Sequence, residues 1–228
     1  MLSRSESTWR INFLVWASTL IFYLVPGVGL SLAAMTALVA VDSAEAHDSD
    51  KHNLGVGVPS SKFHVTRATY TLPDIKLVRD DGRDVSLVQE VDDGRPVVVN
   101  FIYTTCPGIC PIMSLAFSQF QSELGTDRKK VHLVSISVDP EQDTPANLRA
   151  YAKKFEADKQ WQHYTGTVDA SVAAQKAFDA YRGDKMAHDP LTLMRLAPGQ
   201  PWIRIDGFAT GFDLFQQYAS LVGAQLRK

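Results

Sequence analysis

The chain has 228 residues, 45% of them hydrophobic and 21% charged, which fits one globular domain with an appendage and excludes disorder along the whole chain. Its 23 basic and 25 acidic residues give a formal net charge of −2, so the composition indicates no basic face for nucleic acid. Two cysteines are too few for a disulfide-dense scaffold.

Residues 1–46 are typical of a membrane anchor or a signal peptide. Two arginines among the first ten residues precede an uncharged run, 11–41, that a Pro-Gly-Val-Gly segment interrupts. A spanning helix needs about 20 apolar residues, so an uncleaved anchor would end near residue 30. Alternatively, residues 28–41 are the apolar core of a signal peptide that is cleaved after Ala46. Both interpretations leave the arginines in the cytoplasm and predict a periplasmic domain, either anchored at the inner membrane or soluble after cleavage.

The next segment, residues 47–61, is polar and contains glycine and serine, which is typical of a flexible linker. His47 and His52 lie in it and could bind a metal ion, but incidental histidines in a solvated linker are the simpler interpretation. We therefore place the globular domain at residues 62–228.

Within that domain the sequence alternates apolar strands with helical patterns, as in an α/β protein. Continuous apolar runs predict strands at 97–103 and 131–138, each buried on both faces of the sheet. Shorter strands are expected at 65–72, 75–78, 85–87, 161–164, 191–196 and 202–206. We expect the strand at 161–164 to lie at an edge of the sheet. Turn residues join 75–78 to 85–87, and 191–196 to 202–206, as two hairpins.

Helices are expected at 111–124, 145–155, 168–181 and 210–226, from apolar residues at helical spacing. Thr144 and Pro145 are typical of an N-cap and a first helical residue. The order of strand, cysteine loop, helix, strand, helix, then hairpin and helix predicts a thioredoxin-like fold, with a central mixed sheet flanked by helices. The cysteines then lie at the carboxyl end of a central strand, where open α/β sheets place their sites.

Both cysteines lie in the segment Cys106-Pro107-Gly108-Ile109-Cys110. One helical turn would separate their Cα atoms by about 6 Å, which a disulfide accepts. The N-terminus of the following helix favours the thiolate, and thiolates bind soft metals such as Cu(I). Thioredoxin-type redox sites have two intervening residues, and the three found here leave more room for an ion. Metal binding, thiol-disulfide exchange and a structural disulfide are all compatible with this spacing.

A third metal ligand would be a histidine from elsewhere in the chain. The candidates are His64, His132, His163 and His188. His132 lies inside an apolar strand, where a buried side chain with its own hydrogen-bond partners is expected. His188 precedes the strand at 191–196, and in a thioredoxin-like fold that loop faces the cysteines. Met186 and Met113 could add thioether sulfur, although methionines are more common in cores and at the rims of sites.

Two segments, Val99–Pro111 (VNFIYTTCPGICP) and Val134–Pro145 (VSISVDPEQDTP), resemble the Sco/SenC family of copper proteins, and Tyr164-Thr165-Gly166-Thr167 is similar as well. The resemblance extends over about residues 70–219. It implies a thioredoxin-like fold, an N-terminal membrane tether and a role in assembling the copper centre of cytochrome c oxidase. The copper-accepting partner would be an oxidase subunit or another copper protein.

Carried over residue by residue, the resemblance implies that Cys106, Cys110 and His188 bind one copper ion, as Cu(I) or Cu(II), with Asp139 as an acidic side chain beside the site. One departure concerns the residue before the histidine, which is commonly Asp in the family and is Ala187 here, with Asp189 after the histidine. In addition, Pro190 is similar to the proline that faces the thiols in thioredoxins, which predicts a cis bond.

Three functions are compatible with these residues. The first is a copper-binding metallochaperone that uses Cys106, Cys110 and His188. The second is a thiol-disulfide reductase in which Cys106 and Cys110 form a redox-active pair and keep the copper-ligand cysteines of a partner reduced. The third, peroxide reduction, would require an arginine beside the reactive cysteine, and Arg195 is the candidate.

Overall fold

The computed structural model describes residues 63–227 of the chain. The anchor or signal segment predicted at 1–46 and the linker predicted at 47–61 lie outside the described residues. The strands are β1 (Phe63–Ala68), β2 (Lys76–Arg79), β3 (Asp84–Ser86), β4 (Val97–Ile102), β5 (His132–Ser137), β6 (Trp161–Thr165), β7 (Leu191–Arg195) and β8 (Trp202–Gly207). The helices are α1 (Leu87–Val91), α2 (Ile109–Glu123), α3 (Pro145–Lys154), α4 (Val168–Ala177) and α5 (Gly211–Gln225), with short 3-10 turns η1 (Gly125–Lys130) and η2 (Lys185–Ala187).

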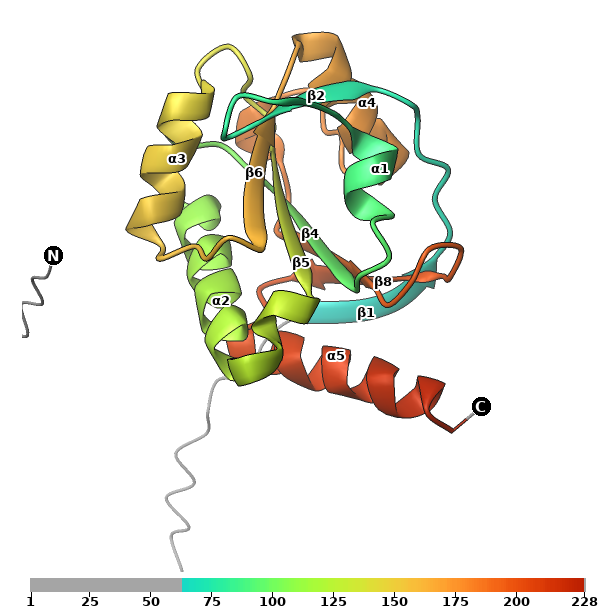
Figure 1. Ribbon diagram of the computed structural model, residues 1–228. Coiled ribbons are helices and arrows are strands. Elements are labelled where there is room, and N and C mark those ends of the chain that lie inside the picture. The colour runs from blue at the N-terminus through green and yellow to red at the C-terminus, as the bar shows by residue number, and fades with distance from the viewer. Residues whose placement is uncertain (1–62, 228) are drawn as a thin grey trace, which may run out of the picture. The chain divides into compact units, whose positions relative to one another are not determined.

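The strands described in residues 63–227 form one mixed sheet in the order β1-β8-β7-β4-β5-β6-β2-β3 (Figure 1). β4, β5 and β6 are parallel to one another, whereas the other neighbouring pairs are antiparallel. This is the mixed, helix-flanked sheet that the sequence predicts. Parallel strands need crossover connections, and α2 and α3 supply them on the way from β4 to β5 and from β5 to β6.

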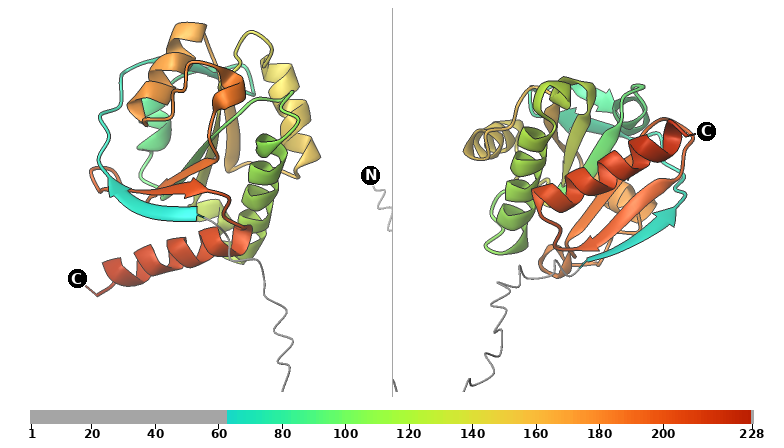
Figure 2. Two further views of the ribbon diagram at one scale, coloured as in Figure 1. Left: turned by 180° about the vertical axis from the view of Figure 1, so that it is seen from behind. Right: turned by 90° about the horizontal axis from the view of Figure 1, so that it is seen from below.

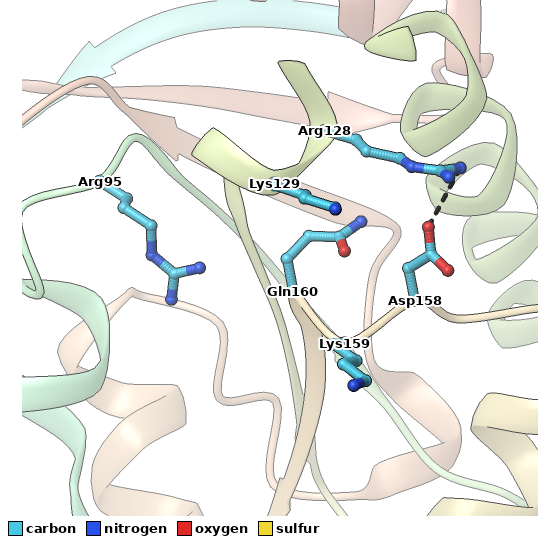
Figure 3. A pocket seen from close by; sticks show the side chains of 6 residues that line it. All are labelled: Arg95, Arg128, Lys129, Asp158, Lys159 and Gln160. Atoms are coloured by element: carbon cyan, nitrogen blue, oxygen red, sulfur yellow. Dashed lines mark ion pairs between the residues drawn. The ribbon is translucent and has the colours of Figure 1, made fainter. Parts of the chain in front are cut away.

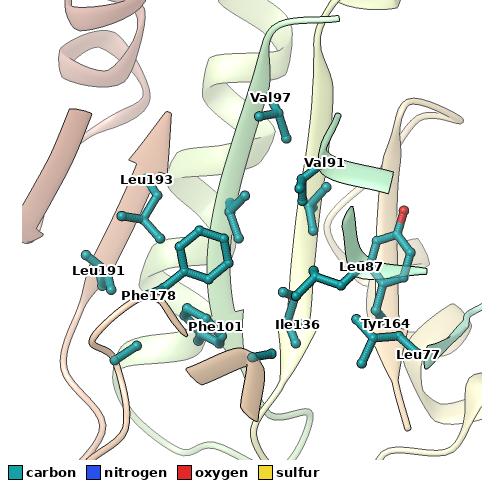
Figure 4. Packing of buried hydrophobic residues seen from close by; sticks show 14 of the residues in the cluster. Leu77, Leu87, Val91, Val97, Phe101, Ile136, Tyr164, Phe178, Leu191 and Leu193 are labelled. Carbon is teal, nitrogen blue, oxygen red and sulfur yellow. The ribbon is translucent and has the colours of Figure 1, made fainter. Parts of the chain in front are cut away.

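The two central strands are buried along their whole length, as their continuous apolar sequences predict. Alternate side chains of β4 enter different clusters, because successive residues of a strand point to opposite faces. Val97, Val99 and Phe101 belong to one cluster with residues of α1 and α4, and Figure 4 shows Phe101 beside Phe178, at the end of α4. Val98 packs with apolar residues of α2 and α5 on the other face.

Helices α2 and α5 pack side by side on that second face (Figure 2). α3 lies next to α2 and adds Leu148 and Tyr151 to a smaller cluster around Cys110. The N-cap predicted at Thr144 is confirmed, and α5 begins at a capped threonine as well. Thr144 accepts a hydrogen bond from the backbone N–H of Asn147, and Thr210 forms a capping box with Asp213.

Several element boundaries differ from the prediction. The strand expected at an edge, 161–164, is β6, and it lies between β5 and β2 because the β2–β3 hairpin pairs with it through Val78 and Arg79. α1 was not predicted; it begins right after Ser86, whose hydroxyl caps it. α2 begins at Ile109, two residues before the expected start, so that Cys110 is helical. None of the helices in residues 63–227 has the length and hydrophobicity needed to cross a bilayer.

Candidate metal centre

The two cysteines lie where β4 ends and α2 begins, as predicted. Cys106 is in the loop after β4, and Cys110 is in the first turn of α2 and fully buried. The backbone N–H of Cys110 points at the Cys106 sulfur, with nitrogen and sulfur 3.4 Å apart. Because Gly108 precedes the helix without a capping side chain, the Cys106 sulfur occupies the position of a helix cap. Both cysteines are free thiols.

His188 reaches this loop from a position 78 residues further along the chain. Its Nε2 lies 3.2 Å from the Cys110 sulfur, and the donor atoms of Cys106, Cys110 and His188 all lie within 4.8 Å of one another. The imidazole is 8% exposed and packs edge-on against the Tyr103 ring, with ring centroids 5.7 Å apart. Its Nδ1 is buried without a side-chain partner. The geometry therefore brings together the three residues that the family resemblance implies as metal ligands.

The two thiols have opposite electrostatic surroundings. Burial opposes ionisation of Cys106, yet hydrogen bonds from the Cys110 thiol and from the backbone N–H groups of Cys110 and Gly108 lower the pKa of Cys106. Burial raises the pKa of Cys110, and the adjacent Cys106 sulfur raises it further. Burial also lowers the pKa of His188, which favours the neutral imidazole that metals bind.

Asp139 forms an ion pair with Lys185, close to the metal-ligand cluster (Cys106, Cys110 and His188). The Asp139 side chain is buried, and one of its carboxylate oxygens lies 2.5 Å from the Lys185 Nζ. Lys185 begins the η2 turn, three residues before His188. This ion pair therefore ties the end of β5 to the segment that carries the histidine.

A second buried acid, Asp143, was missed by the sequence reasoning. It is fully buried and accepts hydrogen bonds from the backbone N–H and the hydroxyl of Thr104, at 3.1 and 2.6 Å, and from the Ser137 hydroxyl at 2.6 Å. Thr104 is two residues before Cys106. The sequence signal that could have identified Asp143 is the Asp-Thr-Pro sequence at the start of α3, which places the carboxylate next to a helix cap.

The other candidate histidines lie outside the cluster. His64 is exposed on β1, at the outer edge of the sheet. His132 is buried as predicted, with its ring nitrogens 3.0 Å from the Glu90 carbonyl and 2.9 Å from the Gln162 amide oxygen. His163 is also buried and stacks on Trp161, with ring centroids 5.2 Å apart.

Two further expectations around the site are wrong. Among residues 63–227 no peptide bond is cis, so the bond before Pro190 is trans. Arg195, the candidate for peroxide reduction, pairs in register with Val97 at the start of β4, whereas the cysteines follow its end. Its guanidinium contacts the end of α1, where it donates to the Val91 carbonyl and forms an ion pair with Asp92, and it stacks on the Trp202 ring. Arg195 therefore cannot support a reactive Cys106.

A small pocket of about 150 Å³ opens at the metal-ligand cluster and is lined by Tyr103, Cys106, Pro107, Gly108, Ile109, Met186 and His188. A larger hollow of about 540 Å³ lies at the opposite ends of the parallel strands, as Figure 3 shows. Arg95, Arg128, Lys129, Asp158, Lys159 and Gln160 line that hollow, and Arg128 and Asp158 form an ion pair 3.1 Å long. No cysteine, methionine or histidine lines this hollow, whereas Cys106, Met186 and His188 all line the smaller pocket.

Comparison with known proteins gives one consistent result. The SCO1/SenC family model matches residues 65–195, more than half of the chain. The SCO1 protein homolog of Bacillus subtilis is 32% identical over 114 residues, which are 49% of this chain and 58% of that relative. The matched segment thus spans less than two thirds of the relative's length.

Two solved structures extend the comparison. The copper-bound structure of Bradyrhizobium japonicum ScoI is 26% identical and has a TM-score of 0.51, covering 57% of this chain and 87% of that one. BsSco, described as a member of the Sco family of cytochrome c oxidase assembly proteins, is 25% identical with a TM-score of 0.57, covering 68% of this chain and 95% of that one.

Proposed function

The chain belongs to the SCO1/SenC family, and on that premise we propose that it is a copper-binding metallochaperone that supports assembly of a copper centre. One observation carries the proposal: the sulfurs of Cys106 and Cys110 and a ring nitrogen of His188 lie within 4.8 Å of one another. We infer that these three side chains are the copper ligands.

The chemistry of the donors fits copper. Thiolate sulfur is a soft ligand that selects Cu(I), and imidazole binds copper in either oxidation state. Structural zinc sites ordinarily have four protein ligands, whereas the two cysteines and one histidine of this cluster supply three, which does not match a structural zinc site. The lowered pKa of Cys106 favours its thiolate, and burial lowers the pKa of His188, which favours the neutral imidazole; these are the forms that bind a metal ion.

The relatives suggest which copper centre is served. A structure of the B. japonicum relative has copper bound, and BsSco belongs to a family of cytochrome c oxidase assembly proteins. By extension, we propose that the copper acceptor is an oxidase subunit or another copper protein.

We also propose that the globular domain, residues 62–228, lies outside the cytoplasm. Sequencing the N-terminus of the mature protein distinguishes a retained segment 1–46 from cleavage after Ala46.

Copper titration of the full-length, reduced chain tests the metal site. We expect one Cu(I) per chain, and we expect His188→Ala to weaken binding by at least about tenfold because a ligand is lost. His64→Ala is the matched control, since His64 is exposed on β1 and should not affect binding. Substoichiometric copper in the wild type, or equal affinities of the two variants, would contradict the proposal.

A second function is favoured by the contrast between the two thiols. Cys106 is partly exposed and has a lowered pKa, whereas Cys110 is buried and has a raised one. This is the arrangement of an attacking and a resolving cysteine in thiol-disulfide exchange. We propose that the chain can also reduce a partner's disulfide through Cys106. If so, Cys110→Ser should accumulate a mixed disulfide at Cys106, and a pair that resists exchange with glutathione would exclude this role.

A further inference from the structure

Met186 is an unusually exposed methionine at the mouth of the metal-ligand pocket. It is 64% exposed, whereas Met113 on α2 and Met194 on β7 are 2% and 1% exposed. Met186 lines the same small pocket as Cys106 and His188 and lies two residues before the histidine. Of the two methionines that the sequence suggested as thioether donors, Met113 is therefore in the core and Met186 is at the site.

Two hydrogen bonds position Met186. Its backbone N–H donates to the Asp184 side chain at 2.9 Å, which fixes the η2 turn. Its sulfur accepts a hydrogen bond from the Tyr103 hydroxyl at 3.1 Å. Tyr103 lines the same small pocket as Cys106, and its ring packs edge-on against the His188 imidazole. The thioether is thus held beside the soft donors although most of the side chain is in solvent.

The surroundings favour a chemical role for this sulfur. A methionine that served only as packing would gain by burial, and Met113 and Met194 show that arrangement in the same molecule. Thioether sulfur is a neutral, soft ligand that prefers Cu(I), and the three proposed ligands leave a position open. The hydrogen bond from Tyr103 uses one lone pair of the sulfur and leaves the second available.

Resting on the proposed copper function, we propose that Met186 is a further Cu(I) ligand at the mouth of the site. The sulfur donates a lone pair to Cu(I), and the copper stays in the +1 state with no transfer of a proton or electron. Because thioether sulfur binds Cu(II) more weakly, Met186 makes the site selective for the reduced ion. Its exposure places this ligand on the side from which an acceptor protein must approach.

Methyl NMR of the full-length chain, labelled with ¹³C at the methionine methyl groups, tests this directly. On anaerobic addition of one equivalent of Cu(I) to the reduced protein in detergent, the Met186 methyl resonance should shift, and those of Met113 and Met194 should not. Met186→Leu assigns the resonance and removes the sulfur at nearly constant volume. Met186→Leu should weaken Cu(I) binding by about tenfold and change Cu(II) binding little. Tenfold is a minimum for a lost ligand, because even the loss of a group that only hydrogen-bonds to a ligand lowers metal affinity by about that factor.

Met113→Leu is the matched control, since it removes a buried thioether, and its Cu(I) affinity should equal that of the wild type. An unshifted Met186 methyl, or a Met186→Leu variant with wild-type Cu(I) affinity, would overturn the inference and leave the three-ligand site intact. A wild-type chain that binds no Cu(I) would overturn both this inference and the proposed function, so the two failures are distinguishable.

Discussion

Asp143 is expected to hold the cysteine loop in place, and replacing it by alanine tests this. The change removes the acceptor for three donors, which are the backbone N–H and hydroxyl of Thr104 and the hydroxyl of Ser137. Water can reach the partly exposed Thr104, whereas Ser137 is fully buried and would be left without its acceptor. At about 1 kcal/mol for each donor of Thr104 and somewhat more for Ser137, the expected loss is about 3 to 4 kcal/mol.

That loss is a large part of the stability of an ordinary domain, which is about 5 to 15 kcal/mol. Urea unfolding of the reduced, metal-free chain measures it, with an unchanged m-value expected because the fold is retained. The melting temperature should fall by on the order of 10 °C. Hydrogen exchange at the Thr104 amide should also become faster, because this N–H loses its acceptor two residues before Cys106.

Asp143→Asn is the control. Its amide oxygen can still accept hydrogen bonds from Thr104, and its NH₂ group can donate one to the Ser137 hydroxyl. It should cost only about 1 kcal/mol. If Asp143→Ala loses less than about 1 kcal/mol, or if both variants lose the same amount, these hydrogen bonds do not stabilise the loop.

Three further predictions concern the site and the helix pair. Lys185→Met leaves the buried Asp139 without its cation and loosens the turn before the histidine, so Cu(I) affinity should fall by about tenfold in a chelator competition. Gly211→Ala places a Cβ atom 2.7 Å from a backbone nitrogen of α2, and urea unfolding should show a loss of about 2 kcal/mol or more. At pH 7.5 iodoacetamide should alkylate Cys106 before Cys110, because the pKa of Cys106 is lowered and that of Cys110 is raised; peptide mass spectrometry measures the order.

Each of these has an outcome that counts against it. Lys159→Met, in the hollow at the other end of the sheet, should leave copper affinity unchanged, and equal effects of the two lysine variants would mean that the Asp139 ion pair has no special role. Gly223→Ala meets only the flexible side chain of Arg227, at 3.5 Å, so it should be neutral or stabilising. Faster alkylation of Cys110 would contradict the contrast between the thiols.

Much of the fold could be predicted from local sequence because its signals are local. The continuous apolar runs of β4 and β5 indicate burial on both faces, and Thr144-Pro145 and Thr210 carry their own capping chemistry. The interior place of β6 could not be predicted. Nothing within Trp161–Thr165 specifies that a hairpin from residues 76–86 will add to its free edge, since pairing of that kind depends on contacts between distant segments.

The same distinction between local sequence signals and contacts of distant segments holds for the metal-ligand cluster. The sequence by itself determined the spacing of Cys106 and Cys110 and their place between a strand and a helix, because these follow from neighbouring residues. Only the tertiary structure brings His188 to 3.2 Å from Cys110, ties Lys185 to Asp139 and holds Met186 on the Tyr103 hydroxyl. These contacts join segments that lie 46 to 83 positions apart, and their distances are set by how β5 and β7 pack beside β4.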